Sequence, residues 1–296
     1  MYNPAFPLAY YYSWENVPDA MLPNIMAEFR EHGAKNLVFS HVWLTRILHD
    51  VKFWSFLIHT ARKQQINLVE AHAPYGQGFD LCCPERGRHP QMIEEHKRAM
   101  NYCAESGCRT YTIHVGAFES AFFQTPNEKV RPLVLDSLEK LLPEAEKIGI
   151  VLAVENSFER SNTPEEVIAY VEHFQSPFLG CCFDAGHAHL MEPFPGKQRS
   201  RYFDWMDAAW GGQIEEYSGA LERMAPYIVT CHLHDNDGYS DAHRLPGEGT
   251  IDWNALIPKI KQLPRLISMQ TEVRTIPGGL AVGKLVRKFQ SLMNEK

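Results

Sequence analysis

The sequence has no hydrophobic run long enough to cross a lipid bilayer. Its longest apolar runs are about eight to ten residues, whereas a membrane-spanning helix needs roughly 20. The first ten residues, MYNPAFPLAY, lack a basic segment followed by an apolar core, so we expect no signal peptide. We therefore expect no membrane partner and a cytoplasmic location.

The sequence also lacks a disulfide framework and an excess of basic residues. Its 7 cysteines are odd in number, and four of them form the adjacent pairs Cys82–Cys83 and Cys181–Cys182. This spacing favours reduced thiols in a cytoplasm. The chain carries 29 Lys and Arg against 36 Asp and Glu, a formal charge of −7, which provides no electrostatic footprint for nucleic acid.

No Gly/Ser-rich or Pro-rich linker divides the 296 residues, so we expect residues 1–296 to form one domain. Short β-branched or aromatic runs that are typical of buried strands occur eight times. They are LAYYYSW from Leu8, NLVFSHV from Asn36, NLVEAHAPY from Asn67, RTYTIHVGA from Arg109, GIVLAVENS from Gly149, FLGCCFDAGHA from Phe178, IVTCHLHDND from Ile228 and LISMQTEV from Leu266.

Stretches with helical periodicity separate these strands. Helices are predicted at residues 19–32, 90–106, 130–148, 164–174 and 213–224. Gly33, Gly107 and Gly149 stand where a left-handed residue ends a helix, and Thr163-Pro164 is typical of a helix start. The strands read as continuous apolar runs, as in a parallel sheet covered on both faces. Eight such units predict an α/β fold, a single (β/α)8 TIM barrel.

Histidines and carboxylates gather where the predicted strands end, which is the catalytic end of a TIM barrel. A lone histidine there is usually a packed side chain, Asp184 could cap a helix, and HLHD could be a strand with one polar face. An ionised carboxylate inside a barrel, however, costs several kcal/mol unless it is paired or binds a metal. The set as a whole would repel itself without divalent cations. Its members are His72, His114, Glu155, Asp184, His187, His232, Asp241, His243 and Glu272.

The motifs around these residues are HAPYG, IHVGA, VEN, DAGHA, HLHDND, DAHRLPGEGTIDW and TEV. With them the chain resembles the xylose-isomerase-like TIM-barrel superfamily, which unites sugar or sugar-phosphate isomerases and epimerases with apurinic-site nucleases of the endonuclease IV type. The resemblance implies a central divalent metal held by Glu155, Asp184, His232 and Glu272. It further implies two more sites, one with His72, His114 and bridging Glu155, and one with His187, Asp241 and His243.

The ligand chemistry suggests which metals to expect, from one central ion up to three ions. Three carboxylates and one imidazole suit Mn²⁺ or Mg²⁺, and Zn²⁺ or Co²⁺ would also bind, whereas the His-rich flanking sets favour Zn²⁺. Cys231 is expected to point away from the mouth by strand alternation and to serve packing.

For the reaction, the resemblance favours isomerisation or epimerisation of a small carbohydrate by proton abstraction next to a carbonyl, through a metal-stabilised enediolate. Glu155 and Glu272 would remove and return the proton. The candidate substrate contacts are His187, Arg244, Tyr75 and Arg274. The GEG turn at 247–249 is either a plain turn or an approach to phosphate.

Three other functions stay open at this level. The nine ligands permit hydrolysis at abasic sites in DNA, and Tyr75 stands where the nucleases use an aromatic residue. Against this, SHVWLTRIL after the second strand and GQGFDLCCPERG after the third are unlike the nuclease loops. Lyase or dehydratase chemistry starts from the same proton abstraction, and a carbohydrate-binding barrel without catalysis would keep the ligands. The aromatic insertion Met191 to Gly212 is a lid, a contact in a homo-oligomer or a locally packed loop.

Overall fold

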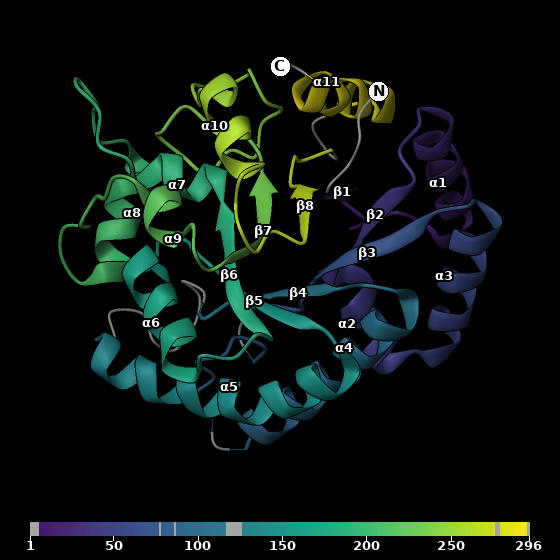
Figure 1. Ribbon diagram of the computed structural model, residues 1–296, viewed down its shortest axis with the longest axis horizontal. Coiled ribbons are helices and arrows are strands. Elements are labelled where there is room, and N and C mark those ends of the chain that lie inside the picture. Colours follow the sequence, from purple (N-terminus) through teal and green to yellow (C-terminus); the bar gives the residue numbers. More distant parts are fainter. Residues whose placement is uncertain (1–5, 77, 86, 117–125, 276–278, 295–296) are drawn as a thin grey trace.

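Eight parallel strands close into a barrel in sequence order, β1 to β8, in the computed structural model, which describes residues 6–76, 78–85, 87–116, 126–275 and 279–294 (Figure 1). β1 pairs with both β2 and β8, so the ring has no free edge. This barrel confirms the predicted fold class. The strands are β1 (Leu8–Tyr10), β2 (Asn36–Phe39), β3 (Asn67–His72), β4 (Thr110–Ile113), β5 (Val151–Glu155), β6 (Leu179–Asp184), β7 (Ile228–Leu233) and β8 (Ser268–Thr271).

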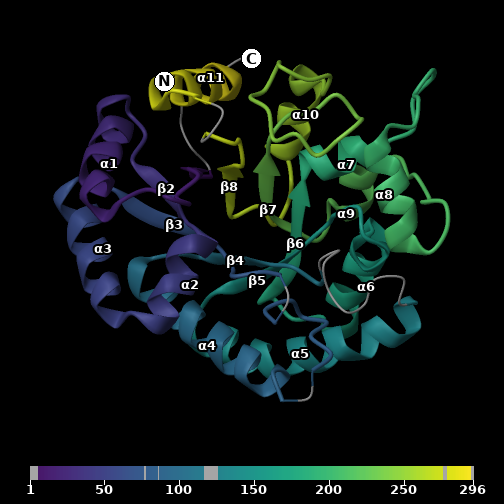
Figure 2. The same ribbon diagram turned by 180° about the vertical axis from the view of Figure 1, so that it is seen from behind.

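Helices surround the strands in both views (Figures 1 and 2). They are η1 (Asp19–Met21), α1 (Leu22–Glu31), α2 (His41–His49), α3 (Val51–Lys63), α4 (His89–Ser106), α5 (Asn127–Ile148), η2 (Arg160–Asn162), α6 (Pro164–Phe174), α7 (Ala185–Met191), α8 (Arg201–Trp210), α9 (Ala220–Met224), α10 (Trp253–Ile260) and α11 (Val282–Asn294). An apolar core between strands and helices includes Cys231, in agreement with the packing role expected for it. All seven cysteines are buried free thiols.

The glycine stops lie where the sequence places them. Gly107 and Gly149 end α4 and α5 with φ of 100° and 77°, and Gly33 follows α1 with φ of 85°. Thr163 is the N-cap residue of α6, but its side chain makes no capping hydrogen bond. Pro164 fills the first helical position there, and a proline has no N–H that needs a cap.

One predicted helix is wrong over most of its length. Residues 213–224 are helical only at 220–224, in α9. The earlier part is tied to the neighbouring insertion instead, because the Ile214 N–H donates to Asp207 and the Tyr217 N–H donates to the Met191 carbonyl. These bonds replace the intrahelical pattern.

The interior of the barrel is polar below its mouth. The hydroxyls of Thr110, Ser268 and Thr230 form a hydrogen-bonded chain with spacings of 3.1 and 3.2 Å, and Thr230 donates to the carboxylate of Glu70 at 2.6 Å. All four residues are fully buried. TIM-barrel interiors are usually filled by Val, Ile and Leu, so this chain of hydroxyls singles out the layer directly beneath the mouth.

The insertion after β6 packs locally. It contributes Phe203, Met206 and Trp210 to a second apolar cluster that also contains Phe158 and Ile214. The buried ammonium of Lys197 donates to the carbonyls of Leu190 and Glu192 and pairs with Glu216. Of the three expectations for this segment, the structure matches the locally packed loop. Whether it also takes part in a homo-oligomer stays a prediction.

None of the helices in the described part of the chain combines the length and apolar character that a membrane crossing requires. The prediction of no signal peptide rests on the first ten residues, and of these residues 1–5 lie outside the described residues. The prediction of one domain over 1–296 stays a prediction.

Candidate metal centre

The predicted ligands meet at the carboxyl ends of the strands. His72, Glu155 and Asp184 are the last residues of β3, β5 and β6, and His232 lies near the end of β7. His114 and Glu272 directly follow β4 and β8. Six consecutive strands thus direct imidazoles and carboxylates into one mouth.

Glu155, Asp184, His232 and Glu272 form a compact group whose ligand atoms all lie within 4.8 Å of one another. His232 is at its centre: Nδ1 lies 3.2 Å from Glu155 Oε1 and 3.2 Å from Glu272 Oε2, and 3.9 Å from Asp184 Oδ2. Three carboxylates around one imidazole form an oxygen-rich donor set that a hard divalent cation would bind.

The two other predicted histidines on the β3 and β4 side adjoin this group. His114 Nε2 lies 3.1 Å from Glu155 Oε2, and His72 Nε2 lies 3.9 Å from the same oxygen and 3.7 Å from Glu272 Oε1. Glu155 therefore lies between the central group and the two histidines, the place that a bridging ligand would occupy.

A second group lies on the β6 and β7 side. It joins the predicted His187, Asp241 and His243 with a residue that the sequence prediction missed, His234. His243 Nε2 lies 3.0 Å and His187 Nε2 3.7 Å from Asp241 Oδ2. His243 has φ of 46°, a left-handed conformation that is rare for a residue with a side chain. Such strain at a cluster of this kind is typical of a functional site.

Local structure explains how these side chains are held. Asp184 is the N-cap of α7, and its Oδ1 accepts the His187 N–H at 2.6 Å. The capping role considered for Asp184 and its place in the central group are therefore compatible. His187 Nδ1 lies 3.0 Å from the Asn156 carbonyl, which sets the orientation of its ring.

The residues fit divalent cations on three observations. The buried oxygens Glu155 Oε2, Glu272 Oε2 and Asp241 Oδ1 accept no hydrogen bond from any described residue. Burial alone would raise the pKa of Glu155, but His232 and His114 hold it well below its usual range. Burial would lower the pKa of His243, yet Asp241 raises it to about 9. The carboxylates thus draw protons onto the imidazoles, and a bound cation would replace those protons.

The pKa of His72 shifts in the opposite direction from that of His243. Burial, together with the neighbouring His114, lowers the pKa of His72 to about 3. A neutral imidazole is the form that binds a metal.

The candidate substrate contacts are distributed around the rim. Tyr75 is 45% exposed, and its ring lies 5.4 Å from that of His72 and 4.7 Å from that of His114. Arg274 is exposed, its backbone N–H donates to the His243 carbonyl, and its charge acts on the phenol of Tyr75. Arg244 differs, because its guanidinium pairs with Asp237 at 2.8 Å. It is therefore engaged within its own loop.

The GEG turn is a structural element of that loop. The Gly247 N–H donates to Asp235 at 2.6 Å, and a Cβ on Gly249 would lie 2.2 Å from the Asn236 carbonyl oxygen. The Trp253 indole donates to the same Asp235 carboxylate. Of the two interpretations of this turn, the contacts match the plain turn.

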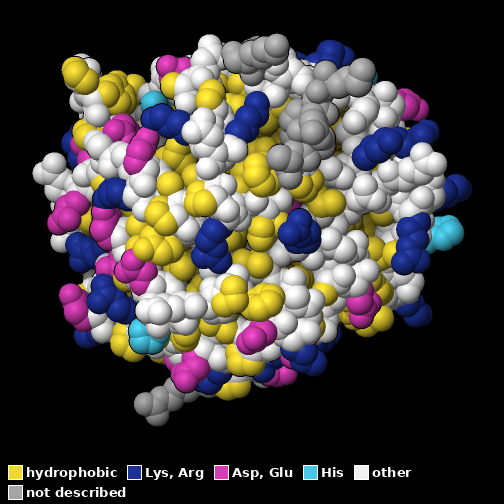
Figure 3. All heavy atoms as spheres, viewed as in Figure 1, with side chains coloured by type: hydrophobic (Ala, Val, Ile, Leu, Met, Phe, Trp, Pro, Cys, Tyr) yellow, Lys and Arg dark blue, Asp and Glu magenta, His cyan; other side chains and the backbone are white. Residues whose placement is uncertain are grey.

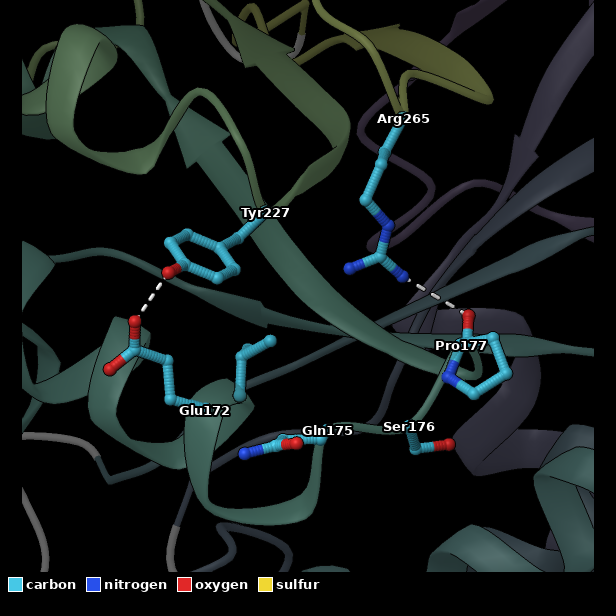
Figure 4. Close-up of a pocket in the computed structure, with 7 residues that line it drawn as sticks. Glu172, Gln175, Ser176, Pro177, Tyr227 and Arg265 are labelled. Atoms are coloured by element: carbon cyan, nitrogen blue, oxygen red, sulfur yellow. Dashed lines mark hydrogen bonds between the residues drawn. The ribbon is translucent and has the colours of Figure 1, made fainter.

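A separate groove of about 820 Å³ lies at the other end of the barrel (Figure 4). Its polar groups bind one another: the Tyr227 hydroxyl donates to Glu172, and Arg265 donates to the carbonyls of Pro177 and Leu179. Apart from Leu179, the first residue of β6, these residues precede β6, β7 and β8, so the groove is remote from the ligands and its contacts stabilise the amino ends of the strands.

The sequence model of one protein family, described as xylose isomerase-like TIM barrel, matches residues 57–290, well over half of the chain. The chain belongs to this family. The resemblance inferred from the strand-end motifs is thereby confirmed, and the matched range contains all nine predicted ligands.

Similar proteins come from distant organisms. The uncharacterized protein MJ1311 of Methanocaldococcus jannaschii is 23% identical over 249 residues, 81% of this chain and 76% of that protein. The structure of the E. coli 3-keto-D-glucoside 4-epimerase YcjR superposes with a TM-score of 0.69 at 14% identity, covering 97% and 98% of the two chains. The TTHB071 protein of Thermus thermophilus, soaked with ZnCl2, superposes with a TM-score of 0.64 at 21% identity, covering 97% and 98%. At these identities the solved structures show a common fold.

Two of the residues that sequence reasoning missed share a simple signal. His234 lies two residues after His232, and Glu70 lies two residues before His72, so strand alternation directs each toward the same side as its partner. Glu15 and His41 were missed as well. Glu15 follows β1 and His41 follows β2, and His41 Nε2 lies 3.4 Å from Glu15 Oε1. No spacing in the sequence links these last two residues.

Proposed function

We propose that this chain is a divalent-metal-dependent isomerase or epimerase that acts on a sugar or sugar phosphate. The observation that carries the proposal is that the carboxylates of Glu155 and Glu272 meet at one imidazole nitrogen, each with an oxygen 3.2 Å from His232 Nδ1. Two carboxylates in one mouth provide the pair of proton-transfer groups that such a reaction needs.

The central cation would be held by Glu155, Asp184, His232 and Glu272, with His72, His114, His187, Asp241 and His243 available for up to two more. When bound, it supplies Lewis-acid polarisation of the carbonyl and neighbouring hydroxyl oxygens. Zn²⁺ suits the His-rich sets and Mn²⁺, Mg²⁺ or Co²⁺ the central one.

The protein's own groups would carry the proton. One of the two carboxylates, Glu155 or Glu272, accepts the proton from the carbon next to the carbonyl at a carboxylate oxygen, and the other returns a proton to the enediolate. His232 lowers the pKa of both carboxylates, which keeps the one that acts as base ionised, and the other would take up a proton from solvent before it returns one to the enediolate. His187 lies beside Asp241 and is suited to orient substrate hydroxyls.

Exposed aromatic rings support a carbohydrate substrate. Tyr75 lies against His72 on one side of the mouth, and Trp205, which is 40% exposed, lies beside Phe158, whose ring contacts His187 on the other side. Flat apolar faces that are open to solvent suit the C–H faces of a sugar ring. The E. coli neighbour, named as an epimerase of a keto-glucoside, agrees with this substrate class.

The proposal is tested by proton exchange. Wild-type protein is incubated in deuterated water with a panel of ketoses and ketose phosphates, and deuterium at the carbon next to the carbonyl is followed by NMR. Glu272→Gln should abolish exchange while circular dichroism stays unchanged, and Glu248→Gln, an exposed carboxylate that pairs with Lys284, is the control. The product spectrum separates epimerisation from dehydration, which begins with the same exchange.

A second function, incision of DNA at abasic sites, is favoured by one observation: His187, Asp241 and His243 add a second group beyond the central set. The loops oppose it. The segment SHVWLTRIL forms α2 with Trp43, Leu44 and Ile47 buried, so it is not free to enter a duplex. On the face in Figure 3, basic and acidic side chains are interspersed. Incision of a duplex with one abasic site, without any deuterium exchange, would replace the sugar proposal with this one.

A further inference from the structure

His234 is buried at the edge of the central group and binds one of its members. Its side chain is fully inaccessible, and its Nε2 lies 3.1 Å from both Oδ1 and Oδ2 of Asp184. The ring stacks on His243 with centroids 3.8 Å apart and planes inclined by 12°. Its position is therefore set by contacts on two sides.

Gly186 provides the space for this ring. A Cβ at Gly186 would lie 1.9 Å from His234 Cε1 and 2.4 Å from His234 Nδ1. Gly186 has no positive φ, so its backbone conformation is open to any residue. Proximity to His234 is therefore the reason that position 186 has no side chain.

The two donors on Asp184 act together. Oδ1 accepts the His187 N–H at 2.6 Å as the cap of α7, and His234 Nε2 faces both carboxylate oxygens. The carboxylate is thus fixed in one orientation, with Oδ2 3.9 Å from His232 Nδ1. Partners behind a metal ligand set its direction and its affinity for the ion.

We propose that His234 is a positioning residue, which orients Asp184 toward the central cation and is not itself a ligand. This inference rests on the metal-dependent function proposed above. The Nε2 of His234 faces Asp184, and the edge of the ring with Cε1 and Nδ1 faces the backbone of α7 at Gly186.

The first test measures metal affinity, with no need for a substrate. Metal-free protein is titrated with Mn²⁺ and with Zn²⁺ in competition with a chelating dye, and bound metal is counted after gel filtration. His234→Phe keeps the aromatic ring and removes the donor, so it should weaken the central site about 10- to 100-fold with an unchanged number of bound ions. His234→Gln retains an N–H donor and should recover part of the affinity.

The outcomes separate two kinds of failure. If wild-type protein binds neither metal, the proposed function fails and this inference fails with it. If wild-type binds metal and His234→Phe binds equally well, only the positioning role is wrong. Loss of one bound ion in His234→Phe would make His234 a ligand and would also overturn the inference.

The second test measures the steric relation in the presence of EDTA. Gly186→Ala should lower the melting temperature of the wild-type chain, because the new methyl group meets the His234 ring. In a His234→Ala background the same change should cost little, because the ring is absent. An equal loss of melting temperature in both backgrounds would show that the His234 ring is not what excludes a side chain at position 186.

Discussion

A buried histidine outside the predicted ligand set shows how single contacts select a protonation state. His96 on α4 lies 2.7 Å from the Phe79 carbonyl through Nε2 and 2.8 Å from the Tyr111 hydroxyl through Nδ1. Since a carbonyl only accepts, Nε2 carries the proton and Nδ1 accepts from Tyr111. Burial lowers the pKa of His96 from 6.5 to about 4.

The sign of the resulting pH dependence follows from proton binding. Between pH 6.5 and 4 the unfolded chain binds a proton at His96 and the folded chain does not, so acid favours unfolding in this window. We expect this group to remove about 2 kcal/mol of the free energy of unfolding between pH 7 and pH 5. Urea unfolding at both pH values measures it. His96→Gln should flatten the slope, and the exposed His59→Gln should not. Equal slopes in all three proteins would contradict the assignment.

The residue scale also shows the reach of sequence reasoning. Glu155 and Glu272 could be predicted as site residues because an ionised carboxylate at the end of a buried strand is costly unless a cation neutralises it. His234 has a weaker signal, because strand alternation directs it to the same side as His232, but a histidine that only packs there would show the same spacing. Arg244 shows the opposite case. Its place next to His243 in the sequence suggests a substrate contact, but its guanidinium pairs with Asp237 in the structure.

At the element scale, the ends of the helices depend on backbone conformation. Gly149 ends α5 with φ of 77°, and a Cβ there would meet nothing within 4 Å. Gly149→Ala should therefore cost about 1 kcal/mol through the left-handed conformation alone. Chemical denaturation measures the loss. Gly87→Ala, at a glycine without positive φ and with equally open space, is the control and should change little.

The insertion is an element with a core of its own, and its stability can be tested separately from the barrel. Phe203 is 1% exposed in the cluster with Phe158 and Trp210. Phe203→Ala should cost about 3 kcal/mol and release the insertion while the strands stay folded. Hydrogen exchange should speed up in peptides from 191–214 and stay slow in β6 and β7. The exposed Trp205→Ala should leave both regions protected, and uniform acceleration would contradict a separate unit.

Elements differ in how well their sequences reveal them. The strands and α4, α5 and α6 could be predicted, because apolar runs and glycine or proline boundaries are local signals. The segment 213–219 could not, because its hydrogen bonds go to Asp207 and Met191 in another element. Tertiary contacts there override local periodicity.

For the whole molecule, the proposed site makes stability depend on metal. Free Mn²⁺ or Zn²⁺ at about 100 times its dissociation constant should stabilise the folded state by about 2.7 kcal/mol, which raises the melting temperature by roughly 5 °C. Scanning calorimetry with metal and with EDTA measures the shift. Glu272→Gln should show a smaller shift. The same melting temperature in wild-type with either addition would count against a cation at this site.

The overall charge of the molecule is linked to the same site. Four of the 36 acidic residues, Glu155, Asp184, Asp241 and Glu272, face the mouth. Part of the formal charge of −7 therefore belongs to the interior of the site, where the proposed cations would balance it, and gives little information about the surface. The fold class followed from the order of elements, whereas the substrate did not, because rim side chains such as Tyr75 and Trp205 acquire meaning only from their positions.

The closure of the barrel determines when, during synthesis, the site becomes complete. Glu272 directly follows β8, the strand that completes the ring by pairing with β1. During synthesis, when β7 has emerged from the ribosome, His232, Glu155 and Asp184 are already available, but Glu272, the fourth of the proposed central ligands, arrives only after the last strand. A nascent chain stalled before residue 268 should therefore hold metal weakly, and capture of the ion would report that the barrel has closed.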